Sequence, residues 1–318
     1  MADNLLTLAD LVKINDQNLA DLDMTDLLND APLLAALASD IASNGTSHKY
    51  TKESGAPVVG FRNPNEGRNH SKSSDTLVTI DLKILDASFH IDKALADAYT
   101  KGGATAMIGR EARRHLRAGF FLAEQQFLYG TSNDADGFVG LAQATTLDGL
   151  TDDMVVDGGG SEATESHLTS VWMIRTNNDL VDMVAVTGQD GNIQIGESTV
   201  IMAEDGDGKK FPAYFTPITG WLGLQIGSIH SICRVANIDT AEGSTDVLTD
   251  DLLSMALERF PASRQPNLIV MHRKARGQLQ RSRTATSPTG AGAPRPTEYE
   301  GIPIITSDAV RIDEDQVN

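Results

Sequence analysis

The chain has 318 residues, 40% of them hydrophobic, and its 44 acidic and 26 basic residues give a formal net charge of −18. A chain of this size can bury a sizeable core, but its acidity disfavours a general grip on nucleic acid. The single cysteine, Cys233, excludes a disulfide framework and a zinc site built from several cysteines. No apolar run approaches the ~20 residues of a membrane span, and the N-terminus lacks a signal-peptide pattern, so we expect no membrane association.

Residues 1–45 alternate short leucine-rich stretches with acidic residues, a pattern typical of short amphipathic helices. The last of these helices is expected over residues 33–41, with Pro32 in its first turn. Isolated helices shorter than ~12 residues are marginal in water, so this arm needs another surface to pack on. A neighbouring subunit could supply that surface.

Residues 46–85 indicate a long two-stranded flap. A turn signal, Asn-Pro-Asn-Glu-Gly-Arg-Asn, occupies residues 63–69. After it, Val78, Ile80, Leu82 and Ile84 alternate with Leu77 and polar residues, which predicts a strand with one apolar face. Because a two-stranded ribbon is marginally stable by itself, a partner subunit is again expected to cover it.

A short helix is expected over residues 86–98, before the break at Gly102 and Gly103. The clearest element follows over residues 104–129 and ends at Gly130. At 1.5 Å per residue this helix is roughly 39 Å long, which suits a structural beam. Its expected core-facing residues recur at three- and four-residue steps, and the main ones are Ile108, Ala112, Leu116, Phe120 and Phe127.

The remaining chain is loop-rich to about residue 165 and then mostly strand to residue 238. Strands are expected at 171–174, 180–186, 198–203, 213–216, 222–226 and 230–238, joined by Asp- and Gly-rich turns in a mainly antiparallel sheet. Helices at 248–260 and 274–283 and strands at 267–271 and 302–305 complete the prediction.

No catalytic or metal-binding motif survives inspection. The seven histidines show no metalloprotease spacing, and residues 205–210 lack both the Ser or Thr of a phosphate loop and the ligand order of a calcium loop. A polar loop explains Asp134 and Asp136 as well as a cation site does. Cys233 and His230 should point to opposite faces of one strand, which makes a nucleophile–base pair improbable and favours a buried thiol. We therefore expect no enzyme, no cofactor and no metal.

Two basic clusters interrupt the acidic composition. Arg110, Arg113, Arg114, His115 and Arg117 would form a solvated face of the long helix that pairs with acids elsewhere. Between residues 259 and 297 there is no acidic residue. This stretch indicates either a DNA-facing patch or a complement to an acidic neighbour, and we favour the neighbour. The candidate residues are Arg273, Lys274, Arg276, Arg281 and Arg283.

The order of these elements resembles the tailed-bacteriophage major capsid proteins that share the Hong Kong phage capsid fold. Short motifs carry the resemblance along nearly the whole chain. They are Thr-Leu-Val-Thr-Ile-Asp-Leu at 76–82, Tyr-Gly at 129–130, Gly-Phe-Val-Gly-Leu at 137–141, Ser-Val-Trp at 170–172, Gly-Trp-Leu-Gly-Leu at 220–224, Arg-Val-Ala-Asn-Ile at 234–238, residues 267–273, and Gly-Ile-Pro-Ile at 301–304 followed by Ser-Asp-Ala at 307–309.

The resemblance implies an α+β fold with an N-terminal arm at 1–45 and an extended two-stranded loop at 46–85. A peripheral domain at 86–244 would hold the spine helix 104–129 and the antiparallel sheet, and an axial domain would span 245–318. It also implies self-assembly into hexamers and pentamers of an icosahedral shell that encloses double-stranded DNA. A separate scaffolding protein, a portal and a possible decoration protein would be partners. The shell would be assembled in the host bacterial cytoplasm and become part of the virion.

Two alternatives remain open at this point. An encapsulin-like nanocompartment shell would share the fold, and a cargo-docking pocket on its inner wall would distinguish it. A nucleic-acid-binding protein would instead use the basic stretch 259–297.

Overall fold

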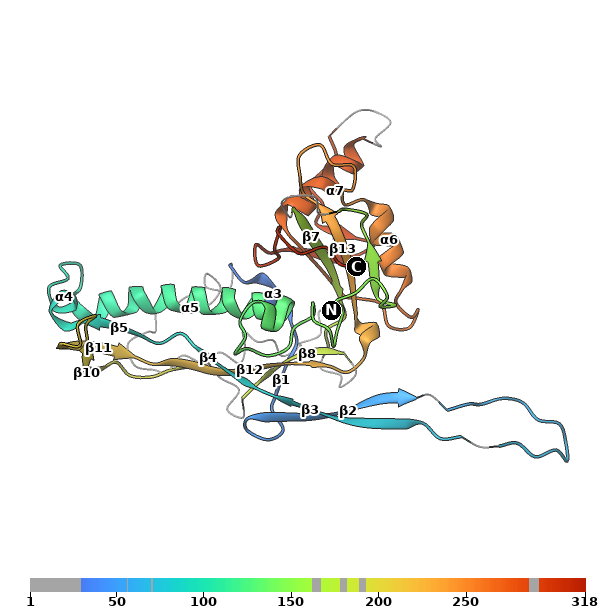
Figure 1. The fold of residues 1–318 in the computed structure, drawn as a ribbon, viewed down its shortest axis with the longest axis horizontal. Coiled ribbons are helices and arrows are strands. Elements are labelled where there is room, and N and C mark those ends of the chain that lie inside the picture. Colours follow the sequence, from blue (N-terminus) through green and yellow to red (C-terminus); the bar gives the residue numbers. More distant parts are fainter. Residues whose placement is uncertain are drawn as a thin grey trace.

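A computed structural model describes residues 30–55, 57–69, 71–161, 167–177, 182–188, 193–285 and 292–318. The first two helices expected in the N-terminal arm lie outside these residues. Figure 1 shows an elongated molecule in which one long helix lies beside long strands, a compact body rises at one end of that helix, and a two-stranded loop projects past the body. In the described ranges, no helix is long and apolar enough to cross a membrane.

The long helix α5 (Gly103–Tyr129) confirms the predicted spine. It begins after Gly102, whose φ of 102° is left-handed, and ends at Gly130, whose φ is 56°. A side chain on Gly130 would also collide with the returning loop, because its Cβ would lie 2.2 Å from the Gly140 nitrogen. That close approach lets the backbone of residues 141 and 142 bond to the last turns of the helix at 3.0 and 2.8 Å.

The apolar stripe of α5 lies against the core. Ala112, Leu116, Phe120 and Phe127 are buried, whereas Ile108, nearer the N-terminal end of the helix, is half-buried and packs at the edge of the core. One face of the helix is therefore covered along most of its length by apolar side chains, which stabilise it beyond its own backbone bonds.

Two sheets lie along the spine helix. The five-stranded sheet has the order β1-β8-β12-β4, with β9 beside β12. The three-stranded sheet has the order β10-β11-β5. Their bounds are β1 (Ser39–Ile41), β4 (Lys83–Asp86), β5 (Phe89–Asp92), β8 (Met183–Thr187), β9 (Ile193–Ile195), β10 (Thr199–Glu204), β11 (Lys210–Thr216) and β12 (Ile218–Ile226). The short helices α3 (Pro32–Ala36) and α4 (Lys93–Asp97) contact the spine helix.

A six-stranded sheet forms the centre of the body, in the order β15-β16-β14-β7-β13-β6. Every residue of β7 is buried, as expected for a central strand. The bounds are β6 (Val155–Asp157), β7 (Leu168–Ile174), β13 (Ile232–Asp239), β14 (Leu268–Met271), β15 (Glu298–Tyr299) and β16 (Ile302–Thr306). Helices α6 (Asp250–Glu258) and α7 (Arg273–Ala285) belong to this body. Two short 3-10 helices are η1 (Gly130–Ser132) and η2 (Ile229–Ser231).

The strands expected in one antiparallel sheet between 168 and 238 are instead distributed over three sheets. β7 and β13 lie in the same sheet as β14 and β16, so a domain boundary at 244/245 would cut through that sheet. Three pairs are parallel: β1 with β8, β6 with β13, and β14 with β16. Strand pairing joins segments far apart in sequence, which the local hydrophobic pattern does not encode.

Three local predictions also need correction. The helix expected over 33–41 ends at Ala36, because residues 39–41 pair with β8 and gain their backbone partners there. The helix expected over 86–98 is the strand β5 followed by the short helix α4, whose N-terminal amide Ala94 is capped by Asp92 at 2.7 Å. His230 lies in the turn η2 and not on the strand that carries Cys233.

Candidate assembly surfaces

The extended loop is the first candidate surface. Its strands β2 (Ser47–Gly55) and β3 (Ser74–Asp81) pair antiparallel from Ser47 opposite Asp81 to Gly55 opposite Ser74, which confirms the predicted flap as far as residue 81. The end of the expected second strand is instead β4, which pairs with β12. The base of the loop is fastened to β12, because the Tyr50 hydroxyl donates to the Ile226 carbonyl at 3.1 Å and His48 bonds Gln225 at 2.7 Å. The five-stranded sheet that contains β12 thus determines the direction in which the loop projects.

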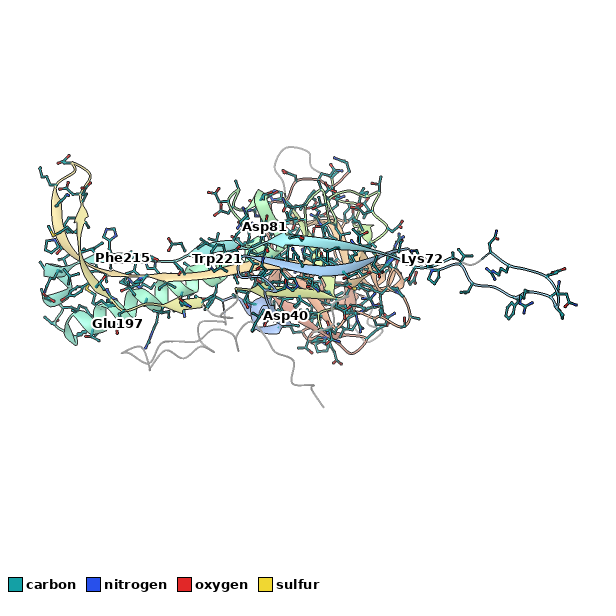
Figure 2. The ribbon with its side chains drawn as sticks, turned by 90° about the horizontal axis from the view of Figure 1, so that it is seen from below. Asp40, Lys72, Asp81, Glu197, Phe215 and Trp221 are labelled. Atoms are coloured by element: carbon teal, nitrogen blue, oxygen red, sulfur yellow. The ribbon has the colours of Figure 1, made fainter. Side chains whose placement is uncertain are left out.

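Exposed apolar side chains stand near the tip of the loop, beside its polar turn. Val58, Val59 and Phe61 are 68%, 84% and 106% exposed, respectively. In Figure 2, the labelled Lys72 lies where the loop leaves the body, and the chain continues well beyond it. Three neighbouring apolar side chains that are exposed far from the core form a candidate surface for contact with another molecule.

A second hairpin, β10–β11, lies at the opposite end of the molecule (Figure 1). Its turn is the predicted Asp- and Gly-rich segment, in which Asp205 accepts from the amides of Asp207 and Lys209 at 3.0 and 2.8 Å. Three consecutive apolar residues of β10, namely Val200, Ile201 and Met202, are exposed. The molecule therefore presents apolar hairpins at both ends.

Glu124 connects the N-terminal segment to the spine helix. This carboxylate is fully buried and accepts from the Leu33 amide at 3.1 Å and from the Ser307 hydroxyl. Burial raises its pKa from 4.5 to about 7, although the hydrogen bonds from Ser307 and from the amides of Leu34 and Leu33 oppose that rise. Glu124 thereby joins α5 to α3 and to the segment after β16.

A second buried carboxylate anchors the C-terminal segment. Glu314 accepts from Arg234 at 2.8 Å and from the Tyr129 hydroxyl at 2.5 Å. The guanidinium of Arg234 also lies 5.0 Å from the ring of Trp172. Burial, followed by the charge of Glu314, raises the pKa of Tyr129 well above its usual value, so the phenol remains a donor. This network holds residues 311–317 against the six-stranded sheet and the end of α5.

The structure separates the five basic residues singled out on the C-terminal stretch. Arg283 makes a two-pronged bond to Asp250, with distances between 2.6 and 3.1 Å, and Arg273 lies 3.3 Å from Asp308. Lys274 and Arg281 are exposed on α7. Arg276 points into a pocket that it shares with arginines of the spine helix.

The basic face of the spine helix pairs partly with acids, as expected. Arg110 and Arg114 lie 3.3 and 2.9 Å from Glu111, and Arg117 lies 2.7 Å from Asp30. His115 stacks on Phe89 with 4.8 Å between ring centroids. Sequence reasoning did not bring Arg114 and Arg117 together with Arg273 and Arg276, which lie about 160 positions away in the chain.

The structure also places the residues of the other sites that were considered from sequence. Asp134 uses one carboxylate oxygen to accept from the Asp136 amide at 3.0 Å, and no group of three metal-ligating side chains occurs in the ranges that the structure describes. Cys233 is buried, and burial raises its pKa to about 12, so the thiol stays protonated. Glu124 and Glu314 escaped the sequence analysis, although a carboxylate beside Ala123 and Phe127 in the apolar stripe was a usable signal for Glu124.

The arrangement of an N-terminal segment, an extended loop, a spine helix and a body with a central sheet is similar to the fold of a solved phage structure. The chain is similar to a solved structure of bacteriophage Epsilon15, with a TM-score of 0.62, 19% identity and 88% of each chain covered. The bacteriophage JBD30 capsid gives a TM-score of 0.47, 10% identity and coverage of 86% and 89%. The SrpI encapsulin of Synechococcus elongatus PCC 7942 gives 0.47, 9% identity and coverage of 67% and 89%.

The family of the chain follows from a match to a protein-family model. The model for major capsid protein GP7 matches residues 17–318, and the chain belongs to that family. A comparison with curated protein sequences finds no match. The chain is thus a shell-forming coat protein and part of a virion, in a family whose role is structural.

Proposed function

We propose that this chain assembles with copies of itself into hexamers and pentamers of an icosahedral shell around double-stranded DNA, and that the loop tip of one subunit packs on its neighbour. The observation that carries the contact is the exposed apolar tip formed by Val58, Val59 and Phe61. The extended loop is two-stranded and has no sheet neighbour along β2 or β3 within the described residues. A ribbon of this kind gains stability when another surface covers it.

The same proposal implies other proteins as partners of the subunit. A shell of this type needs a separate scaffolding protein and a portal, and a decoration protein is a further candidate partner. Assembly would take place in the cytoplasm of the host bacterium. The subunit would act without enzymatic activity, because its buried acids and its thiol serve as internal anchors and core residues rather than lining an open cleft with a nucleophile and a base.

The domain division is proposed anew from the sheets. We assign the six-stranded sheet, α6 and α7 to the axial domain, which then includes β6, β7 and β13 from before residue 245. The spine helix with the three-stranded sheet and α4 would be the peripheral domain. This division keeps the six-stranded sheet and the three-stranded sheet each within one unit.

The contact is tested by Phe61→Asp in the full chain, with Glu66→Ser in the same loop as the matched control. Phe61 touches no core residue of its own subunit, so the variant should fold with an unchanged circular dichroism spectrum and thermal midpoint. It should lose assembly, measured as the fraction of protein in particles by sedimentation and negative-stain microscopy. The control should assemble normally. Particles formed by Phe61→Asp in the parent's yield would refute the contact.

A further inference from the structure

A pocket lined by five arginines lies between the spine helix and α7. It has a volume of about 580 Å³. Arg114 and Arg117 come from α5, Arg273 and Arg276 from α7, and Arg295 from the segment before β15. Asp30 and Asp308 are the acidic residues in its lining. In a chain with a net charge of −18, a pocket with this excess of positive charge is a local reversal.

Three of the five arginines already hold carboxylates. Arg117 pairs with Asp30 at 2.7 Å, Arg273 with Asp308 at 3.3 Å, and Arg114 with Glu111 at 2.9 Å. In the described part of the chain, neither Arg276 nor Arg295 has an acidic partner within 4.0 Å. The Arg276 Nε atom is buried and makes no hydrogen bond to any described residue.

Among the described residues, two guanidinium groups therefore line the same pocket without a carboxylate within 4.0 Å of either. Burial lowers the pKa of Arg276, and the positive charge of Arg295 lowers it further. A buried donor without a partner destabilises the fold, and a charged one does so more strongly. A carboxylate placed between the two groups would satisfy the donor and remove the repulsion.

The chain itself supplies such carboxylates next to the pocket. The described residues begin at Asp30, on the pocket wall, and 29 residues precede it. That segment contains six aspartates and one basic residue, Lys13. The aspartates are Asp3, Asp10, Asp16, Asp21, Asp23 and Asp26. Since a chain spans at most about 3.6 Å per residue, Asp26 stays within about 14 Å of Asp30 and Asp21 within about 32 Å.

We propose that the arginine pocket binds aspartates of residues 1–29 of the same chain, with Arg276 and Arg295 as the receiving groups. The tether keeps these carboxylates at a high effective concentration, so no second subunit is required. A single carboxylate suits the site better than a nucleic-acid backbone does, because a backbone is bulkier and brings several negative charges towards the carboxylates of Asp30 and Asp308.

The test is zero-length crosslinking in the unassembled full chain, which makes it independent of shell formation. Arg276→Lys and Arg295→Lys each place a primary amine in the pocket, and a carbodiimide joins such an amine to a carboxylate in contact with it. Arg281→Lys, on the same helix as Arg276 but outside the pocket, is the matched control. Equal amounts of ¹⁴N- and ¹⁵N-labelled subunits are mixed before reaction, and the crosslinked peptides are identified by mass spectrometry.

We expect crosslinks from positions 276 and 295 to Asp21, Asp23 or Asp26, within single-isotope peptide pairs, and none of these from the control. Mixed-isotope pairs would show that a neighbour fills the pocket and would overturn the proposal. Crosslinks confined to Asp30, Asp308 or residues outside 1–29 would overturn it as well.

A second measurement reverses the charge at the two receiving positions. The double variant Arg276→Glu with Arg295→Glu should raise the rate of tryptic cleavage at Lys13 by about tenfold, the effect of losing one charge-assisted bond. Arg281→Glu should leave this rate unchanged. An unchanged rate in the double variant, combined with loss of binding to a double-stranded oligonucleotide, would instead assign the pocket to nucleic acid.

Discussion

Replacing Glu124 by glutamine should remove a defined part of the pH dependence of subunit stability. The carboxylate is fully buried, and burial raises its pKa to about 7 from an ordinary value of 4.5. The folded chain therefore binds a proton more tightly than the unfolded chain does. Stability from this group is greatest below about pH 4.5 and falls as the pH rises towards 7, because the ionised form is more costly in the folded state.

The size of the effect follows from the two pKa values. Between pH 5.5 and pH 8, a folded-state pKa of about 7 against 4.5 lowers the free energy of unfolding by about 2 kcal/mol. The amide introduced by Glu124→Gln has no charge to lose, so the variant chain should lack this term. At pH 8 the free energy of unfolding of the variant should exceed that of the parent by at least that amount, less one cost. The amide has a single acceptor oxygen to offer to the two donors, Leu33 and Ser307.

The assay is urea unfolding of the unassembled subunit at pH 5.5 and pH 8, for the parent and the variant. The change between the two pH values should differ by about 2 kcal/mol between the two chains, whatever other groups titrate. Ser307→Ala gives a directional check. The Ser307 hydroxyl lowers the pKa of Glu124, so its loss should raise that pKa and move the fall in stability to higher pH. An identical pH dependence in the parent and the glutamine variant would refute the assignment of a raised pKa to this carboxylate.

Phe120→Ala should lower the free energy of unfolding by about 3 to 5 kcal/mol in urea titrations, because a buried aromatic ring is removed, while Leu122→Ala on the exposed side of α5 should cost far less. Phe120→Asp should prevent folding, and a soluble, assembly-competent aspartate variant would contradict the packing of the spine helix. Glu314→Ala should cost about 3 to 5 kcal/mol because Arg234 is left buried and unpaired, and a double replacement by methionine should recover part of that loss; an equal loss in both chains would argue against the ion pair. Limited proteolysis should first cut the unassembled subunit between positions 63 and 74, and assembly should protect these sites; a resistant loop in the free subunit would count against the proposed contact.

The sequence by itself determined the elements whose signals are local. The stripe from Ile108 to Phe127, closed by Gly130, specified the spine helix, because a period of 3.6 residues sustained over about five turns has no competing interpretation. The turn-rich centre of residues 46–85 and the alternation of Val78 and Ile80 likewise specified the two-stranded loop. The order of short motifs along the chain was enough to indicate the family.

Only the tertiary structure decided which strands share a sheet. The sequence pattern predicts that residues 39–41 end a helix. They form a strand instead, because β8, far away in the chain, is a parallel partner. In the same way, β7 belongs with β14 and β13, so the division of the chain into domains follows strand pairing rather than sequence order.

The same distinction between local sequence and tertiary structure applies to the candidate sites. Composition alone revealed that residues 259–297 are basic, yet it could not show that Arg283 is committed to Asp250 while Arg276 faces arginines of the spine helix. Charge is a property of each residue, but pairing depends on distances between residues brought together by folding. The arginine pocket therefore exists only where α5, α7 and the chain around residue 307 meet, and the buried Glu124 only where α5 meets α3 and Ser307, since the energy of a charge is determined by its neighbours and its burial.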